Sequence, residues 1–202
     1  GLVSEQGGPA LPTHHTPMTA QPGARELAAG SNELTLRFES EAVNGVKLAK
    51  TYSLKRGSYV VDVKHEVINT GSTPVSPQLY LQLVRDGTPP EGESSFYFTF
   101  TGPAMYTDAG KFQKLEFKDI DKGKNDHVQQ ANDGWVAMVQ HYFASAWLVP
   151  DKASRQFVTK KDSDREYSLS MLLPLGAVAP GASKAHAATL FAGPQEENKL
   201  AE

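Results

Sequence analysis

The fold class follows most directly from the stretch Gly134-Trp135-Val136-Ala137-Met138-Val139-Gln140-His141-Tyr142-Phe143-Ala144-Ser145-Ala146-Trp147-Leu148-Val149-Pro150, which holds both tryptophans of the chain. Neither set of alternate positions in this stretch is strongly polar. A strand that is apolar on both faces is typically covered on both faces. We therefore predict a strand deep in a β core, with Trp135 and Trp147 buried.

Outside this stretch, apolar and polar residues alternate along many short runs, as they do in half-buried strands. The runs 46–55 and 58–69 flank Arg56-Gly57, which predicts a hairpin turn. Further strands are expected over 34–38, 79–84, 96–100, 112–120, 155–160, 166–173 and 185–191. About ten strands joined by turns, with almost no helix, predict an all-β protein built as a large two-sheet sandwich.

The two ends of the chain differ in composition from this pattern. Residues 1–30 contain Gly7-Gly8-Pro9 and Pro22-Gly23, and their apolar residues show no period. Because such a composition buries too little surface to offset chain entropy, we predict a flexible tether over 1–30 and a folded domain over 31–202. The last residues begin with Pro194 and continue with acids and good helix formers, which predicts the start of a C-terminal helix.

Composition excludes several classes of protein. The 202 residues carry 20 basic and 23 acidic side chains, so the net charge of −3 offers no electrostatic footprint for nucleic acid. The absence of cysteine excludes thiolate zinc sites, disulfides and thiol catalysis. No run approaches the ~18 apolar residues that a membrane-spanning helix needs. Because the chain starts at Gly1 without an initiator methionine, we expect it to be a fragment of a longer protein.

The six histidines offer no metal-binding spacing. His65 and His141 fall on mostly apolar strand positions, where a lone histidine is usually hydrogen-bonded structure. His14-His15 lies in the N-terminal arm, and His127 and His186 lie in or beside polar segments. Neither H-x-H nor H-E-x-x-H occurs, so we expect no metal site.

The carboxylates form no recognisable catalytic set either. Glycoside hydrolysis needs two carboxylates about 5–10 Å apart in a cleft, and the sequence cannot pair the acids it places in loops and on polar strand faces. The stretch from Gly102 to Gly110-Lys111 has the wrong glycine spacing for a phosphate loop. We therefore expect no catalytic, cofactor-binding or metal-binding residue, no cofactor and no enzymatic activity. The acids considered are Asp86, Glu91, Glu93, Asp108, Asp119 and Asp121.

Four segments together carry a resemblance to a known family, and one of them is Gly92-Glu93-Ser94-Ser95-Phe96. The stretch 134–147 resembles the pattern G-W-[VI]-A-M-x-Q-x-Y-F-x-[ST]-A-W, and Lys50-Thr51-Tyr52-Ser53-Leu54-Lys55-Arg56-Gly57-Ser58-Tyr59 resembles K-[TR]-[YF]-x-[LF]-x-R-G-x-Y. Leu190-Phe191-Ala192-Gly193-Pro194 resembles L-[YFW]-x-G-P. These are patterns of the large periplasmic domain of bacterial membrane protein insertases of the YidC/Oxa/Alb family, and the similarity covers most of residues 33–202.

The resemblance implies a β-supersandwich like that of galactose mutarotases, located at the periplasmic face of the Gram-negative inner membrane. It implies that 1–30 follows a first membrane helix and that the helix after Pro194 leads towards a second. The chain has none of the family's membrane helices. The expected function is that of a non-catalytic, monomeric accessory domain that assists insertion and folding of inner-membrane proteins, with Sec translocon components or nascent membrane proteins as partners.

Two questions stay open at the level of sequence. A carbohydrate-binding or mutarotase-like module on the same sandwich is the alternative function, although no histidine–carboxylate set can be assigned to it. The partner surface is also open. Because loops on a rigid sandwich are the usual place for recognition, the polar loops 86–93 and 121–134 are candidates beside exposed strand edges.

Overall fold

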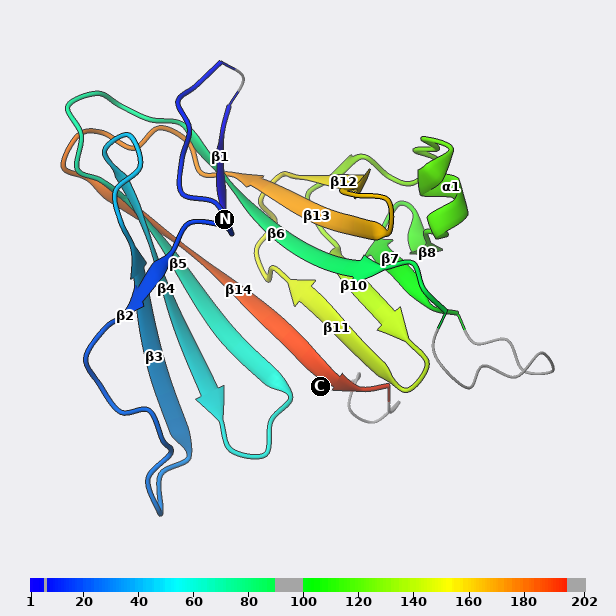
Figure 1. Ribbon diagram of the computed structural model, residues 1–202, viewed down its shortest axis with the longest axis horizontal. Coiled ribbons are helices and arrows are strands. Elements are labelled where there is room, and N and C mark those ends of the chain that lie inside the picture. The colour runs from blue at the N-terminus through cyan, green and yellow to red at the C-terminus, as the bar shows by residue number, and fades with distance from the viewer. Residues whose placement is uncertain (6, 90–99, 196–202) are drawn as a thin grey trace. The chain divides into compact units, whose positions relative to one another are not determined.

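The computed structural model describes residues 1–5, 7–89 and 100–195, and these residues form mainly β-strands (Figure 1). Within these ranges one short helix is present, α1 (Phe117–Asp121). The strands form two sheets, and the strand pairs with a defined register are antiparallel. The expected all-β fold with two antiparallel sheets is confirmed. The chain divides into two compact units, the first made of Gly1–Tyr80 and Leu173–Leu190, the second of Leu81–Leu172 and the residues from Phe191.

In the first unit, the longest strands form a hairpin with an alternating core face. Leu48 on β4 (Val46–Lys55) pairs with Val67 on β5 (Val60–Asn69), and both side chains are buried. Arg56-Gly57 lies between the two strands, and Gly57 adopts a φ of 73°, so the predicted turn is confirmed. The sheet order here is β2 (Met18–Ala20), β3 (Glu33–Ser40), β4 (Val46–Lys55), β5 (Val60–Asn69) and β14 (Ser183–Pro194), and β1 (Leu2–Ser4) pairs with β6 (Pro77–Asp86).

The segment 1–30, expected to be a flexible tether, contributes β1 and β2 to this unit. Leu2 and Leu11 are buried, and the Leu2 N–H donates to the Pro12 carbonyl at 2.8 Å. Isolated apolar residues without a period give no strand signal, because their burial depends on distant partners rather than on local pattern. The tether over 1–30 stays a prediction, and within that segment residues 21–30 contain no strand.

The second unit has strands from both sheets, with buried side chains such as Met105, Val136 and Phe157. The indole N–H of Trp147 donates to the Gln82 carbonyl at 3.3 Å, which joins a strand of one sheet to a strand of the other. In the nine-stranded sheet, the neighbouring strands of this unit are β11 (Phe143–Leu148), β10 (Trp135–Gln140), β7 (Gly102–Thr107) and β8 (Lys111–Lys114). In the five-stranded sheet, they are β6, β13 (Glu166–Pro174), β12 (Arg155–Lys161) and β9 (Gln130–Ala131).

The tryptophan segment is a hairpin, so the prediction of one long strand was wrong. β10 and β11 pair antiparallel from Trp135↔Leu148 to Gln140↔Phe143, and His141 and Tyr142 form the turn. His141 adopts a φ of 39°, which is uncommon for a residue other than glycine. A hairpin that is apolar on both faces has the same pattern as one buried strand, and this turn contains no glycine, proline or asparagine to mark it.

The two tryptophans lie on opposite faces of this hairpin, and both are half-buried rather than buried. Trp147 pairs with the fully buried Val136 and faces the core. Trp135 is one residue earlier on β10 than Val136, and because side chains alternate along a strand, it faces the other way. The predicted burial of both tryptophans is therefore corrected.

Two further predictions differ from the structure or lie outside it. The irregular strand expected over 112–120 is the end of β8 followed by α1. Phe117 and Ile120 are three residues apart, so they share one face of the helix; Ile120 is buried and the Phe117 ring contacts Tyr167 with a centroid distance of 4.6 Å. The strand expected over 96–100 lies almost wholly outside the described residues. So does the C-terminal helix, apart from Pro194, which ends β14, and Gln195, which follows it.

Candidate functional site

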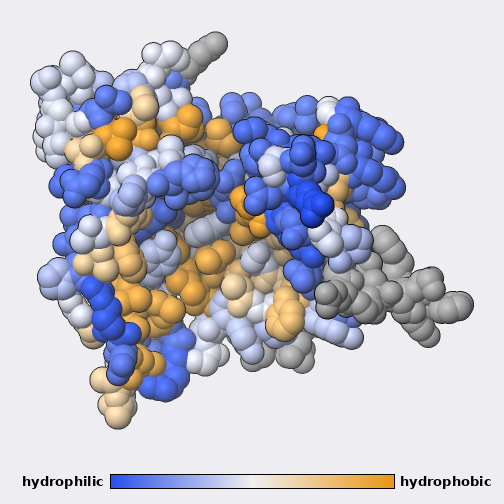
Figure 2. Space-filling view, in the orientation of Figure 1, coloured by the Kyte–Doolittle hydropathy of each residue, from blue (hydrophilic) through white to orange (hydrophobic). Residues whose placement is uncertain are grey.

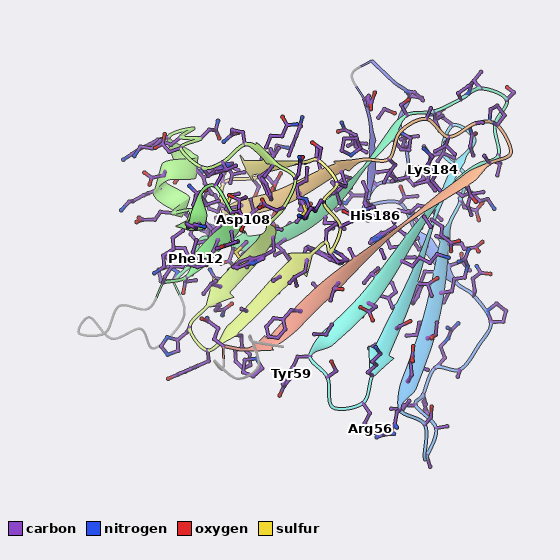
Figure 3. The ribbon with its side chains drawn as sticks, turned by 180° about the vertical axis from the view of Figure 1, so that it is seen from behind. Arg56, Tyr59, Asp108, Phe112, Lys184 and His186 are labelled. Atoms are coloured by element: carbon purple, nitrogen blue, oxygen red, sulfur yellow. The ribbon has the colours of Figure 1, made fainter. Side chains whose placement is uncertain are left out.

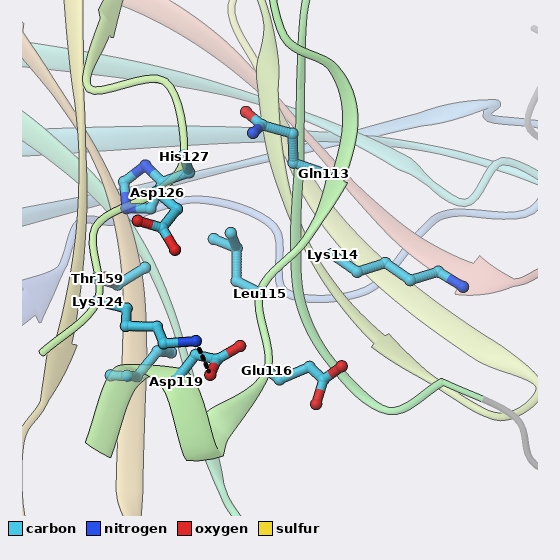
Figure 4. A pocket seen from close by; sticks show the side chains of 10 residues that line it. Gln113, Lys114, Leu115, Glu116, Asp119, Lys124, Asp126, His127 and Thr159 are labelled. Carbon is cyan, nitrogen blue, oxygen red and sulfur yellow. Dashed lines mark ion pairs between the residues drawn. The ribbon is translucent and has the colours of Figure 1, made fainter. Parts of the chain in front are cut away.

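A shallow pocket lies beside α1 in the second unit (Figure 4). Its volume of about 110 Å³ is below the ~300–1,000 Å³ of typical small-molecule sites. Asp119 and His127 both line it, so the structure brings one of the acids and one of the histidines considered from the sequence to the same pocket. The remaining lining residues include Gln113, Lys114, Glu116, Lys124, Asp126 and Thr159.

Two acids at or near this pocket, Asp119 and Asp121, are paired with lysines. Lys124 donates to Asp119 at 2.9 Å, and this hydrogen bond holds the pKa of Asp119 below its usual value. Asp121 accepts from Lys161 at 2.8 Å and from the Tyr167 hydroxyl at 2.9 Å, and the first of these bonds chiefly lowers its pKa. A carboxylate held ionised in this way is a poor general acid. Asp119 and Asp121 are therefore poor candidates for the proton donor that sugar chemistry requires.

The other predicted acids do not join this pair. Asp86 is exposed at the end of β6, where it accepts the Thr88 N–H. Asp108 is exposed, and its N–H donates to Asp133 at 3.1 Å. Glu91 and Glu93 lie outside the part of the chain that the structure describes.

His65 is buried in the first unit with its ring on the core face of β5. Its pKa is lowered to about 3, first because burial disfavours the charged imidazolium and second because the N-terminal amine, Lys50 and His186 carry positive charge nearby. A hydrogen bond with the His186 backbone acts in the opposite direction. His65 is therefore a neutral structural histidine near neutral pH.

The remaining histidines are dispersed. His14 lies 2.7 Å from the Tyr80 hydroxyl through Nδ1, and His15 packs beside it. His127 Nδ1 lies 2.9 Å from the Val128 carbonyl. His141, which we expected on an apolar strand position, lies in the β10–β11 turn instead. Among the described residues, no three histidine or acidic side chains are placed to hold a metal ion.

The feature that sequence reasoning missed is a row of apolar side chains across four strands. Trp135 pairs with Leu148 on β11 and with Tyr106 on β7, and Tyr106 pairs with Phe112 on β8. Directly paired residues share one face of a sheet, and this face is opposite to the buried Val136. We call Leu148, Trp135, Tyr106 and Phe112 the outward row.

The outward row is partly exposed and its rings contact one another. Phe112 is 50% exposed and Leu148 37%. The Tyr106 and Trp135 rings stack with centroids 6.0 Å apart, and the Phe112 ring is also 6.0 Å from Trp135. Apolar side chains reach the surface elsewhere too (Figure 2). Figure 3 shows Phe112 on β8 and, in the first unit, Arg56 and Tyr59 at the free end of the β4–β5 hairpin.

The base of the β10–β11 hairpin is held by Arg155, whose side chain is fully buried. Its guanidinium donates to the carbonyls of Gly134 at 3.0 Å and Val149 at 3.1 Å, the residues on either side of the hairpin. It also donates to the carbonyls of Ala153 and Asp151. An arginine on a predicted strand gives no signal of such burial, because its partners are backbone groups that every sequence has.

Comparison with known proteins identifies the chain's relatives. The model of the YidC periplasmic domain family matches residues 1–202. A membrane protein insertase YidC of Janthinobacterium sp. (strain Marseille) is 51% identical over 193 residues, which cover 96% of this chain and 34% of that protein. The corresponding insertase of Nitrosospira multiformis is 43% identical over 201 residues, covering 100% of this chain and 35% of that protein. The chain spans about a third of the length of these relatives.

Among solved structures, the GH36 α-galactosidase AgaA of Geobacillus stearothermophilus aligns with a TM-score of 0.50 at 12% identity, covering 98% of this chain and 30% of that one. At this identity the likeness concerns the fold alone. The family match over the whole chain and the relatives at 43% and 51% identity are independent of that likeness. They show that this chain belongs to the family of YidC periplasmic domains, which lie at the periplasmic face of the Gram-negative inner membrane.

Proposed function

We propose that this domain is a non-catalytic accessory part of a membrane protein insertase. It would assist insertion and folding of inner-membrane proteins by contacting Sec translocon components or nascent membrane proteins. The support is the name shared by relatives that are 43–52% identical to the chain. Among the described residues, no helix is long and apolar enough to cross a membrane.

The outward row is the observation that carries the proposed contact. It presents an apolar surface on one face of β11, β10, β7 and β8, and β8 ends the sheet order among the described strands. Exposed aromatic side chains beside a strand edge suit an extended apolar segment, which can add main-chain hydrogen bonds to side-chain contacts. Nascent membrane proteins are rich in such segments.

The non-catalytic part of the proposal rests on the state of the titratable groups. Asp119 and Asp121 are paired with lysines, and His65 is buried with a pKa of about 3. A mutarotase needs one group that donates a proton and another that accepts it on the same sugar. We propose that this chain converts no sugar. Turnover of an aldose anomer that His65→Ala or His141→Ala abolishes would contradict this.

The contact is tested by site-specific photo-cross-linking in the full-length insertase. A cross-linking amino acid at Phe112 should capture Sec translocon components or a nascent membrane protein, and one at Val158, a 41% exposed position on β12, should capture neither. Phe112→Ser tests whether the apolar ring itself matters. Equal yields at positions 112 and 158 would reject the outward row as the contact surface.

The polar loops 86–93 and 121–134 remain a second candidate for the contact. Shortening both in the full-length protein should lower the cross-linking yield only if they, rather than the outward row, reach the partner. We also propose that the isolated domain is a monomer, which sedimentation would measure directly.

The alternative, a carbohydrate-binding or mutarotase-like module, has one observation in its favour. The stacked Tyr106 and Trp135 rings offer a flat aromatic face of the kind that can pack against another ring. A saturable change of tryptophan fluorescence on adding galactose or glucose, lost in Trp135→Ala, would favour this alternative.

A further inference from the structure

The turn of the β10–β11 hairpin exposes two aromatic side chains. Tyr142 is 70% exposed and Phe143 62%, more than any other large hydrophobic side chain among the described residues. The four other residues from Gln140 to Ser145 carry no formal charge when His141 is neutral. Since water-exposed aromatic rings cost free energy, a turn built this way points to a second surface that covers it.

The backbone of this turn is satisfied from within the protein. Gln195 donates its N–H to the Tyr142 carbonyl at 2.8 Å, and its side-chain amide donates to the carbonyls of His141 and Phe143, each at 3.2 Å. Three successive carbonyls thus have protein partners. A turn in water does not need them, whereas a turn that leaves water does, because an unsatisfied carbonyl is costly away from water.

Among the described residues, the charged side chain that is hydrogen-bonded to Gln140, just before the turn, is positive. The Arg85 guanidinium donates to the Gln140 side chain at 3.3 Å, and it also donates to the carbonyls of Asp86 and Thr88. The Asp86 carboxylate, one residue away, accepts the Thr88 N–H. An arginine beside exposed aromatic rings matches the phosphate layer above an apolar phase.

We propose that the β10–β11 turn rests in the lipid headgroup region of the inner membrane, with Tyr142 and Phe143 as interfacial anchors and Arg85 on phospholipid phosphate. The domain lies at the periplasmic face of that membrane, so a lipid surface is close to it. Tyrosine places an apolar ring and a polar tip at such a boundary. A protein interface would use the rings and the carbonyl bonds made by Gln195 equally well, and it is the location at the membrane that favours lipid.

The test uses single-cysteine variants, which the absence of native cysteine makes clean. Tyr142→Cys and, as control, Val158→Cys are labelled with the fluorophore NBD. Each chain is held through a C-terminal hexahistidine tag on vesicles of phosphatidylethanolamine and phosphatidylglycerol that contain a nickel-chelating lipid. Some lipids carry a nitroxide quencher near the headgroup end of the acyl chain.

Quenching at position 142 should be several-fold stronger than at position 158. Adding Phe143→Ser to the first variant should lower the inserted-to-free ratio of the turn by about tenfold. Arg85→Gln should lower it more on these vesicles than on phosphatidylcholine vesicles, because phosphatidylglycerol adds net negative charge to the phosphate layer. Unchanged thermal midpoints show that the variants are folded. Equal quenching at both positions, no effect of Phe143→Ser, or shielding of the dye only when membrane proteins are added would each overturn the proposal.

Discussion

The two ends of the β10–β11 hairpin are held in the same way but in opposite surroundings. At the base, Arg155 binds the carbonyls of Gly134 and Val149 from a fully buried position. At the turn, Gln195 binds three carbonyls beside exposed aromatic rings. Where water is excluded, losing the partner leaves charged or polar groups unsatisfied, whereas at an exposed turn water replaces it. Each hydrogen bond should therefore contribute much more to stability at the base than at the turn.

The largest expected effect is at the base. Arg155→Leu should lower the free energy of unfolding by about 3–5 kcal/mol, because it leaves several buried carbonyls without donors. Urea denaturation measures the change. Arg165→Leu is the matched control, since Arg165 is exposed, and it should change stability by less than about 0.5 kcal/mol. Similar losses in the two variants would contradict the role assigned to Arg155.

The two tryptophans near the base sharpen the comparison between inner and outer faces. Trp147→Ala should cost about 3–4 kcal/mol, because the inner ring packs on the core and donates to Gln82. Trp135→Ala should cost less, about 1–2 kcal/mol, because the outer ring has solvent on one side. Thermal unfolding of both variants gives the ranking. A reversed order would place Trp135 in the core after all.

His65 extends the comparison to a buried ionisable group in the first unit. Its pKa falls from 6.5 to about 3 on folding, so between these values the unfolded chain binds a proton that the folded chain does not. Stability should therefore fall as pH drops below 6.5, by up to about 1.4 kcal/mol per pH unit. Unfolding free energies measured at several pH values should show a weaker dependence in His65→Gln. The exposed His15→Gln should keep the dependence of the parent.

The smallest effect is expected at the turn. Gln195→Ala should cost about 1 kcal/mol or less, because water can bind the three released carbonyls. Amide hydrogen exchange at Gln140 and Phe143 should become faster while the rest of β10 stays protected. A loss as large as that of Arg155→Leu would show that the turn is as dependent on its partner as the base.

The strands were predictable where one face is polar and the other apolar. β4 and β5 alternate clearly and their turn contains Gly57, so both they and the turn were found. The β10–β11 turn was not, because both faces of this hairpin are apolar and its carbonyls are bound by Gln195, which lies more than fifty residues later in the chain. Local pattern cannot report a partner that distant.

The candidate site was harder to predict than the fold. The outward row depends on register across four strands, and Phe112 and Trp135 meet only because both pair with Tyr106. Nor does the local sequence around Asp119 or Arg155 indicate that Lys124 binds the first or that the second is buried. The sequence does contain the family patterns, and these patterns predicted the family without any knowledge of the geometry of a site.

The first unit has a consequence for the order in which the chain is made. Its strand β5 ends at Asn69, and the neighbour that completes the sheet on that side, β14, begins at Ser183. A chain that emerges N-terminus first must therefore wait for a long intervening segment before the edge of β5 is covered. Until then β5 offers unpaired backbone groups to any other chain, which favours aggregation. Ribosomal stalling or proteolysis before residue 183 would thus yield an aggregation-prone intermediate rather than a smaller folded domain.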